Sequence, residues 1–233
     1  MSDSGLPGDE KTPIRGRDPE AMRVLYAEHS SLVAARSLTY SETFSRVSIF
    51  LAVLSGSVIA LALIAQAAHF GATFISIAIL MLAIVLFVGV TTVSRLIALN
   101  LENLRWVSGM NRVRRAYLER NPDLEPYFIA GSHDDPLGIM LTLGFDTLPA
   151  RNAGSVFEGL QTIPGTVGVL VAVVAGALVG LIATALVAPQ VVVVIAAGGT
   201  FAVTFGLFAG WGQRAFARHM ARLEVHFPGA KEP

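Results

Sequence analysis

The sequence predicts an all-α integral membrane protein in which four transmembrane helices form two hairpins with cytoplasmic helical extensions. Only 15% of the 233 residues are charged, whereas soluble domains carry about 25%. Two stretches, 47–94 and 159–213, contain no Asp, Glu, Lys or Arg. A transmembrane helix needs roughly 20 apolar residues. Each stretch is therefore long enough for two spans joined by a turn.

Each uncharged stretch contains a break near its middle. In the first stretch the break is expected at Gly71, because glycine adopts backbone angles that other residues avoid. In the second it is expected at Pro189, which cannot continue a helix interior. The sequence therefore predicts transmembrane spans at 47–69, 72–94, 164–187 and 191–212.

The basic residues predict the topology. Of the 17 Lys and Arg residues, six precede the first span, seven lie between the second and third spans, and four follow the last. Basic residues favour the cytoplasmic side, so we expect both termini and the central loop to be cytoplasmic. Arg far outnumbers Lys, and Ala, Val and Gly abound. This composition is typical of GC-rich bacterial genomes and indicates a multi-pass protein of a bacterial plasma membrane.

The polar segments divide the chain into four regions. Residues 1–17 are rich in Gly, Pro and charge, which predicts disorder. Residues 18–121 are expected to form an amphipathic helix, the first hairpin and a long cytoplasmic helix. A cytoplasmic loop follows over 122–162. The second hairpin and a basic C-terminal helix occupy 163–233.

A seven-residue repeat follows the second span, and we call its members the seam. Such a repeat indicates packing against another helix, and an Asn within it can set the register. Two interpretations stay open: the seam packs antiparallel on residues 19–46 of the same chain, or it joins two subunits. The seam comprises Leu96, Leu99, Asn103, Trp106, Met110, Val113 and Tyr117.

The third and fourth spans each contain small residues at every fourth position. Small residues at this spacing line one helix face and let membrane helices approach closely. The two ladders could pack within the hairpin or form a subunit contact. The first ladder is Gly168, Ala172, Gly176 and Gly180, and the second is Gly198, Ala202, Gly206 and Gly210.

The loop sequence "GSHDDP" at 131–136 is the best candidate for chemistry. His133, Asp134 and Asp135 supply imidazole and carboxylate groups that suit several divalent metals, although no second histidine lies nearby. The alternative is a helix start, with Asp135 as the N-cap, Pro136 in the first position and Gly144 at the end. This alternative accounts for more of the residues and is favoured.

The rest of the sequence offers little catalytic signal. No nucleotide-binding glycine loop or His-Glu-x-x-His motif is present, and no cofactor or nucleic acid is expected. The spans lack Asp, Glu, Lys and Arg, which disfavours ion-coupled transport. After the last span, Arg214, Arg218 and Arg222 share one helix face. Two interpretations stay open: contact with anionic lipid headgroups, or, as favoured, the ordinary excess of basic residues on the cytoplasmic side.

The stretches "LYAEHSSLVAARSLTYSETFSRVSIF" and "NLENLRWVSGMNRVRRAYLERNPDLEPYF" resemble a group of uncharacterised bacterial four-span membrane proteins. In layout, residues 19–120 also resemble SLATT domains, in which a cytoplasmic helix precedes two spans and a long helix follows. The SLATT resemblance implies a pore-forming effector, although the second hairpin departs from its two-span pattern.

Three functions are compatible with these patterns. The leading hypothesis is a non-enzymatic membrane scaffold or homo-oligomeric assembly that acts through its cytoplasmic helices. One alternative is an oligomeric pore. The other is a metal-dependent membrane enzyme built on His133, Asp134 and Asp135.

Overall fold

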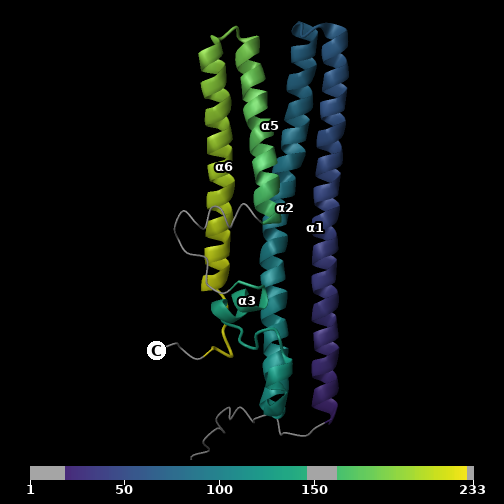
Figure 1. Cartoon of the computed structure of the whole chain (residues 1–233), viewed down its shortest axis with the longest axis vertical. Coiled ribbons are helices and arrows are strands. Elements are labelled where there is room, and N and C mark those ends of the chain that lie inside the picture. Colours follow the sequence, from purple (N-terminus) through teal and green to yellow (C-terminus); the bar gives the residue numbers. More distant parts are fainter. Residues whose placement is uncertain (1–18, 146–161, 230–233) are drawn as a thin grey trace, which may run out of the picture.

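The computed structural model describes residues 19–145 and 162–229, which form helices and connecting loops without any strand. Four of the helices are long and apolar enough to cross a membrane, so the predicted fold class is confirmed. They lie side by side as two hairpins (Figure 1). The elements are α1 (Pro19–Ala68), α2 (Ala72–Arg120), the 3-10 helix η1 (Pro122–Tyr127), α3 (Pro136–Thr142), α5 (Ile163–Ala185) and α6 (Gln190–Ala221). The disorder predicted for 1–17 lies outside the described residues.

The turn of the first hairpin lies where the sequence predicts it, but for a different reason. His69 and Phe70 adopt the left-handed backbone, with φ of 48° and 56°, whereas Gly71 has φ of −71°. Gly71 instead avoids crowding, because a Cβ there would lie 3.1 Å from the carbonyl oxygen of Ala68, which is closer than most Cβ contacts. Its own N–H donates a hydrogen bond to that oxygen.

The first two helices are much longer than a bilayer requires. A span needs roughly 20 residues, whereas α1 has 50 and α2 has 49. Beyond Arg95, the first charged residue after the second span, α2 continues to Arg120. At 1.5 Å per residue this extension is about 38 Å long. α6 also continues past the predicted end of its span and stops at Ala221.

α2 is the central element, because it contacts α1, α3, α5, α6 and η1. In the membrane-spanning part, Phe50 of α1 and Val171 of α5 are both completely buried against it. They meet at Gly89, where a Cβ would lie 2.6 Å from the Val171 side chain and 3.0 Å from the Phe50 ring. Glycine at this position therefore allows three helices to approach one another.

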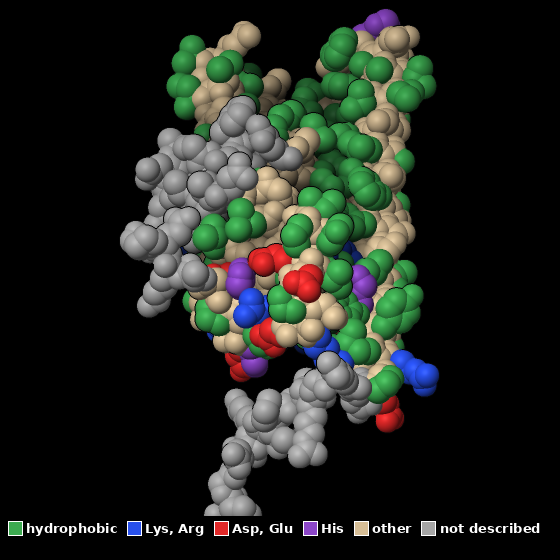
Figure 2. Space-filling view, turned by 60° about the horizontal axis from the view of Figure 1, so that its bottom comes forward, with side chains coloured by type: hydrophobic (Ala, Val, Ile, Leu, Met, Phe, Trp, Pro, Cys, Tyr) green, Lys and Arg blue, Asp and Glu red, His purple; other side chains and the backbone are tan. Residues whose placement is uncertain are grey.

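The charged residues gather at one end of the molecule, which we call the polar end. It contains residues 19–46, 95–145 and 213–229, and Figure 2 shows its mixture of basic, acidic and histidine side chains below hydrophobic helix shafts. The two hairpin turns lie at the opposite end (Figure 1). The fold therefore brings the described segments that flank the four spans together on one side.

Candidate functional site

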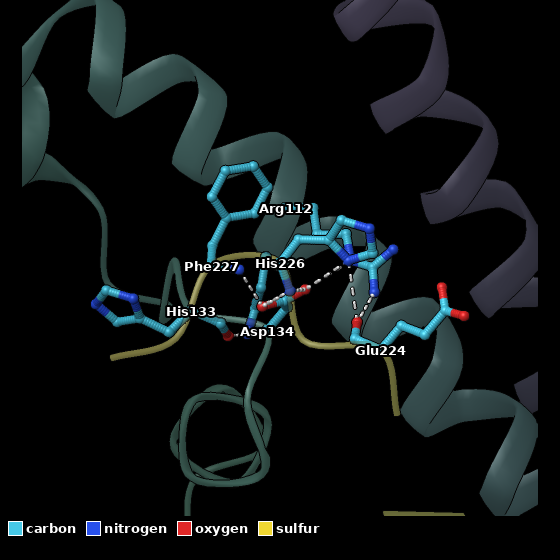
Figure 3. Close-up of polar contacts among 7 residues, drawn as sticks. Arg112, His133, Asp134, Glu224, His226 and Phe227 are labelled. Carbon is cyan, nitrogen blue, oxygen red and sulfur yellow. Dashed lines mark hydrogen bonds and ion pairs between the residues drawn. The ribbon is translucent and has the colours of Figure 1, made fainter. Parts of the chain in front are cut away.

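Asp134 lies at the centre of a group of contacts that ties the C-terminal segment to α2. Its side chain is completely buried. The backbone N–H groups of His226 and Phe227 donate hydrogen bonds to its carboxylate at 2.9 and 2.8 Å. Arg112 of α2 donates from Nε at 2.8 Å and from Nη2 to the Glu224 carbonyl. Figure 3 shows these donors converging on one carboxylate, and we call this group the clasp.

The electrostatics of the clasp favour the ionised form of Asp134. Burial alone would raise the pKa of this carboxyl group. The two backbone hydrogen bonds and the Arg112 guanidinium outweigh burial, so the pKa of Asp134 lies below its ordinary value. Asp134 is therefore a satisfied structural anion at neutral pH.

Asn111, one residue before Arg112, fixes the loop from the other side. Its side chain is completely buried, and Nδ2 donates to the carbonyl oxygens of His133 and Gly138 at 2.7 and 3.2 Å. Its Oδ1 accepts from Thr142 at 3.0 Å and from Arg114 at 2.9 Å. The oxygen and the NH₂ group of the side-chain amide are thus both used, and the contacts to His133, Gly138 and Thr142 hold the loop and α3 on α2.

Asp135 begins α3 as the helix-start interpretation requires. Its Oδ1 accepts from the Gly138 N–H at 2.9 Å, and Pro136 takes the first position. Gly144, with φ of 86°, follows the last turn. Asp135 also accepts from the Gly229 N–H through Oδ2 at 3.4 Å. It therefore holds the C-terminal segment as well as the helix start.

The described residues do not fit a metal site in this loop. The imidazole of His133 points away from the Asp134 carboxylate (Figure 3). The Asp134 oxygens already face N–H donors, which a cation would have to displace. Within residues 19–145 and 162–229, no three His, Asp or Glu side chains are arranged to hold a metal ion.

The seam packs on α1 of the same chain. Arg36 donates to Asn103 Oδ1 at 3.0 Å, and the Trp106 indole donates to the hydroxyl of Thr39 at 3.1 Å. Leu32 packs with three further members of the seam, which are Met110, Val113 and Tyr117, while Leu96 and Leu99 belong to the main core. The structure therefore gives the intramolecular alternative, and the seam is not a free subunit interface.

The two ladders lie in different environments. On α5, a Cβ at Gly176 would lie 2.8 Å from the Ala197 oxygen of α6, and one at Gly180 would lie 3.4 Å from the Ala197 methyl group. Gly168 also faces α6, and Ala172 is fully buried. On α6, Cβ atoms at Gly198 and Gly206 would meet nothing within 4 Å. Ala202 is exposed, and Gly210 faces only the Arg214 side chain. We call the α6 set the open ladder.

The row of basic residues after the last span is divided. Arg214 and Arg218 are exposed on α6, and Arg218 Nε donates to the Arg214 carbonyl at 3.2 Å. Arg222 follows the last residue of α6 and faces a cleft against α2. Of the three, only Arg214 and Arg218 lie on α6 with their side chains exposed and outside this cleft.

The fold and these contacts define a class, which is a four-helix multi-pass membrane protein with a fixed polar end. Comparison with protein-family models, with curated proteins and with solved structures gave no match.

Proposed function

We propose that the protein is a non-enzymatic scaffold of a bacterial plasma membrane, which assembles with copies of itself and holds its polar end on the cytoplasmic side. The observation that carries this proposal is the open ladder. It consists of small residues at the same spacing as those that α5 packs against α6. A Cβ at Gly198 or Gly206 would nevertheless meet no described atom within 4 Å, Ala202 is exposed, and Gly210 faces only Arg214 of its own helix.

The position of the open ladder suits a second copy of the chain. α5 contacts α6 at Ala197 and Phe201, each one position before a member of the ladder. Adjacent positions on an α-helix differ by about 100° in direction. The ladder therefore faces sideways from the α5 contact, and a second molecule can dock there without displacing α5.

The low burial of α6 also indicates that this helix has a free surface for a partner. In the most apolar 18-residue stretch of α5, 39% of the residues are buried, whereas none is buried in the corresponding stretch of α6. Residues 190–213 carry no charged side chain, so the partner must also be a membrane helix. Two copies of the same small-residue face are self-complementary across a two-fold axis, which makes the chain its own best partner.

The seam and the clasp at the polar end are occupied by contacts within the chain, which leaves the spans as the surface for assembly. The seam is occupied by α1, and the clasp uses Asp134, Arg112 and the C-terminal segment internally. A scaffold built in this way presents a preformed helical layer to its surroundings. The basic residues at this end favour the cytoplasmic side and contact with anionic lipids through Arg214 and Arg218.

Native mass spectrometry from nanodiscs tests the proposal. The wild-type chain should appear as an oligomer, and Gly206→Leu should shift it to the monomer because the added side chain separates the two helices. Val203→Leu, on an exposed neighbouring position of α6, is the matched control and should leave the oligomer intact. A monomeric wild type, or an oligomer that survives Gly206→Leu, contradicts the proposal.

A second measurement separates the scaffold from the oligomeric pore. Both require assembly, but only a pore should release a trapped dye from liposomes that contain the wild-type oligomer. Dye retention together with an intact oligomer supports the scaffold, and dye release that disappears with Gly206→Leu supports the pore.

A further inference from the structure

Three charged side chains meet where the first hairpin leaves the membrane, and we call them the boundary triad. Glu42 and Arg46 lie on α1, and Arg95 lies on α2. Arg46 Nε donates to Glu42 Oε1 at 2.8 Å. Arg95 donates to both carboxylate oxygens, from Nε at 2.8 Å and from Nη2 at 2.9 Å. The triad therefore links the two helices at the border of the uncharged stretch 47–94.

The boundary triad has an excess of positive charge. Hydrogen bonds from Arg95 and then from Arg46 lower the pKa of Glu42 to about 2, so its carboxylate is ionised at neutral pH. Both guanidinium groups stay protonated. Two cations and one anion leave one positive charge. Glu102, which also acts on Arg95, lies seven positions further along α2, about 10 Å away from the membrane.

The arginine nitrogens that Glu42 does not use can be reached from outside. The side chain of Arg46 is 44% exposed and that of Arg95 is 40% exposed. Among the described residues, the Glu42 contacts leave both terminal nitrogens of Arg46 and one of Arg95 available for another acceptor. Both Nε atoms lie 2.8 Å from the same oxygen. The two cations are therefore already held together, which lowers the cost of ordering them around an anion.

The boundary triad lies at the height of lipid phosphate groups. Arg46 and Arg95 are the charged residues on either side of the uncharged stretch. Glu42 lies five positions before Val47, which is about 7.5 Å along the helix. The headgroup layer extends about 5–8 Å beyond the hydrocarbon core. The guanidinium groups therefore lie in the layer that contains the phosphates.

An exposed apolar surface continues from the boundary triad into the membrane. Ile49 of α1 lies two turns below the carboxylate, and Phe87 and Ile84 lie two and three turns below Arg95 on one face of α2. Their exposed fractions are 58%, 71% and 54%. Gly89, which faces α5, points about 120° away from Arg95 around the axis of α2. This side of the first hairpin is therefore free of α5 and open to an acyl chain.

We propose that the boundary triad binds the phosphate of an anionic phospholipid, with an acyl chain lying along Ile49 and Phe87. Guanidinium groups bind phosphate oxygens through charge-assisted hydrogen bonds, and the free nitrogens of Arg46 and Arg95 supply them. The excess positive charge favours a phosphoglycerol headgroup over phosphocholine, which carries its own cation. The site does not depend on assembly of the protein, because the open ladder lies on α6.

Native mass spectrometry of delipidated protein measures this binding. The protein in detergent is titrated with phosphatidylglycerol, with phosphatidylcholine and with water-soluble glycerol 3-phosphate. Phosphatidylglycerol should give one tight, saturable adduct per chain, and phosphatidylcholine should bind more weakly. Glycerol 3-phosphate should not compete with phosphatidylglycerol at equal concentration, because it lacks the acyl chains.

Arginine variants locate the adduct. Arg46→Ala and Arg95→Ala should each weaken phosphatidylglycerol binding by about fivefold, as expected for one basic residue at an anionic membrane surface. Arg115→Ala is the matched control. The Arg115 side chain is 39% exposed and pairs with Glu119 through Nε, but it lies 20 positions beyond Arg95, about 30 Å along α2. Its removal should leave the affinity unchanged.

Glu42→Gln separates a lipid site from an ion pair that only joins α1 to α2. The variant removes the negative charge that competes with phosphate for the arginines, so phosphatidylglycerol should bind more tightly. A purely structural ion pair predicts instead that Glu42→Gln and Arg95→Ala both lower the thermal midpoint and that neither changes lipid affinity. Arg46 pairs with Glu42 inside α1, so Arg46→Ala keeps the link between the helices and carries the test even where Arg95→Ala does not fold.

Three results would overturn the proposal. One is equal affinity for phosphatidylglycerol and phosphatidylcholine. Another is unchanged phosphatidylglycerol affinity in Arg46→Ala. The third is competition by glycerol 3-phosphate, because that result would assign the site to a soluble phosphate rather than to a lipid headgroup.

Discussion

Replacing Asp134 with alanine should release the C-terminal segment while leaving the spans intact. The change removes the acceptor for the His226 and Phe227 N–H groups and for Arg112. Hydrogen bonds to charged groups contribute about 1.5–3 kcal/mol each. Water can replace part of this, because the Arg112 side chain is 36% exposed and the segment is near the surface. We therefore expect the closed clasp to lose about 2–4 kcal/mol, which is roughly a 30- to 700-fold increase in opening.

Hydrogen–deuterium exchange in nanodiscs measures this opening directly. Peptides that cover 222–229 should exchange faster in Asp134→Ala by that factor, whereas peptides from α5 should be unchanged. Asp123→Ala is the control, because Asp123 is an exposed carboxylate of η1 at the same end of the molecule. Equal protection of His226 and Phe227 in wild type and Asp134→Ala would falsify the assignment of Asp134 as the anchor.

Three further measurements test the clasp, the contact of α5 with α6, and the contact of α1 with α2. Folding lowers the pKa of Asp134, so the stability that its carboxylate gives the clasp is complete above the ordinary pKa and is lost as pH falls through the folded pKa. Hydrogen exchange of the C-terminal segment should therefore accelerate only below about pH 4. Asp134→Asn should not show this acceleration. Gly176→Ala should destabilise the protein by about 1–3 kcal/mol, because its Cβ would lie 2.8 Å from a backbone oxygen of α6. Gly206→Ala should instead raise the thermal midpoint of the monomer, because its Cβ would meet nothing within 4 Å and alanine favours a helix over glycine by about 1 kcal/mol. Arg36→Ala and Asn103→Ala should show a coupling of about 0.5–1.5 kcal/mol in a double-mutant cycle of unfolding, and strictly additive effects would exclude their hydrogen bond as a contributor.

The fold was predictable because its main determinant is local in sequence. Charged side chains are costly in a bilayer core, so transmembrane segments appear in the sequence as long uncharged stretches. This cost does not depend on which helices pack together. The turn at 69–71 was predicted at the right place for the wrong reason. His69 and Phe70 take the left-handed backbone; histidine is among the non-glycine residues enriched in this conformation, whereas phenylalanine is not.

The candidate site was predictable only where its contacts are local. The Asp135 cap joins residues three positions apart, so the pattern "DP" was enough to indicate it. Asp134 instead meets partners 22 and 92–93 positions away. Periodicity in the sequence cannot indicate such contacts, so the role of Asp134 was not predicted. The metal site, which the sequence left as the less favoured alternative for His133, Asp134 and Asp135, is not formed by these side chains.

The ladders show the same limit in the membrane. Identical spacing on α5 and α6 suggested identical roles, because spacing records which residues share a helix face but not what that face meets. The glycines of α5 face α6 at Ala197. The face of α6 that contacts α5 is adjacent to its own ladder, so Gly198 and Gly206 face no described residue. Glycine lowers helix stability relative to alanine by about 1 kcal/mol per residue, and on an isolated lipid-facing surface nothing offsets this loss. Close approach of a second helix would offset it, which is why Gly206→Leu should disrupt an oligomer rather than the monomer.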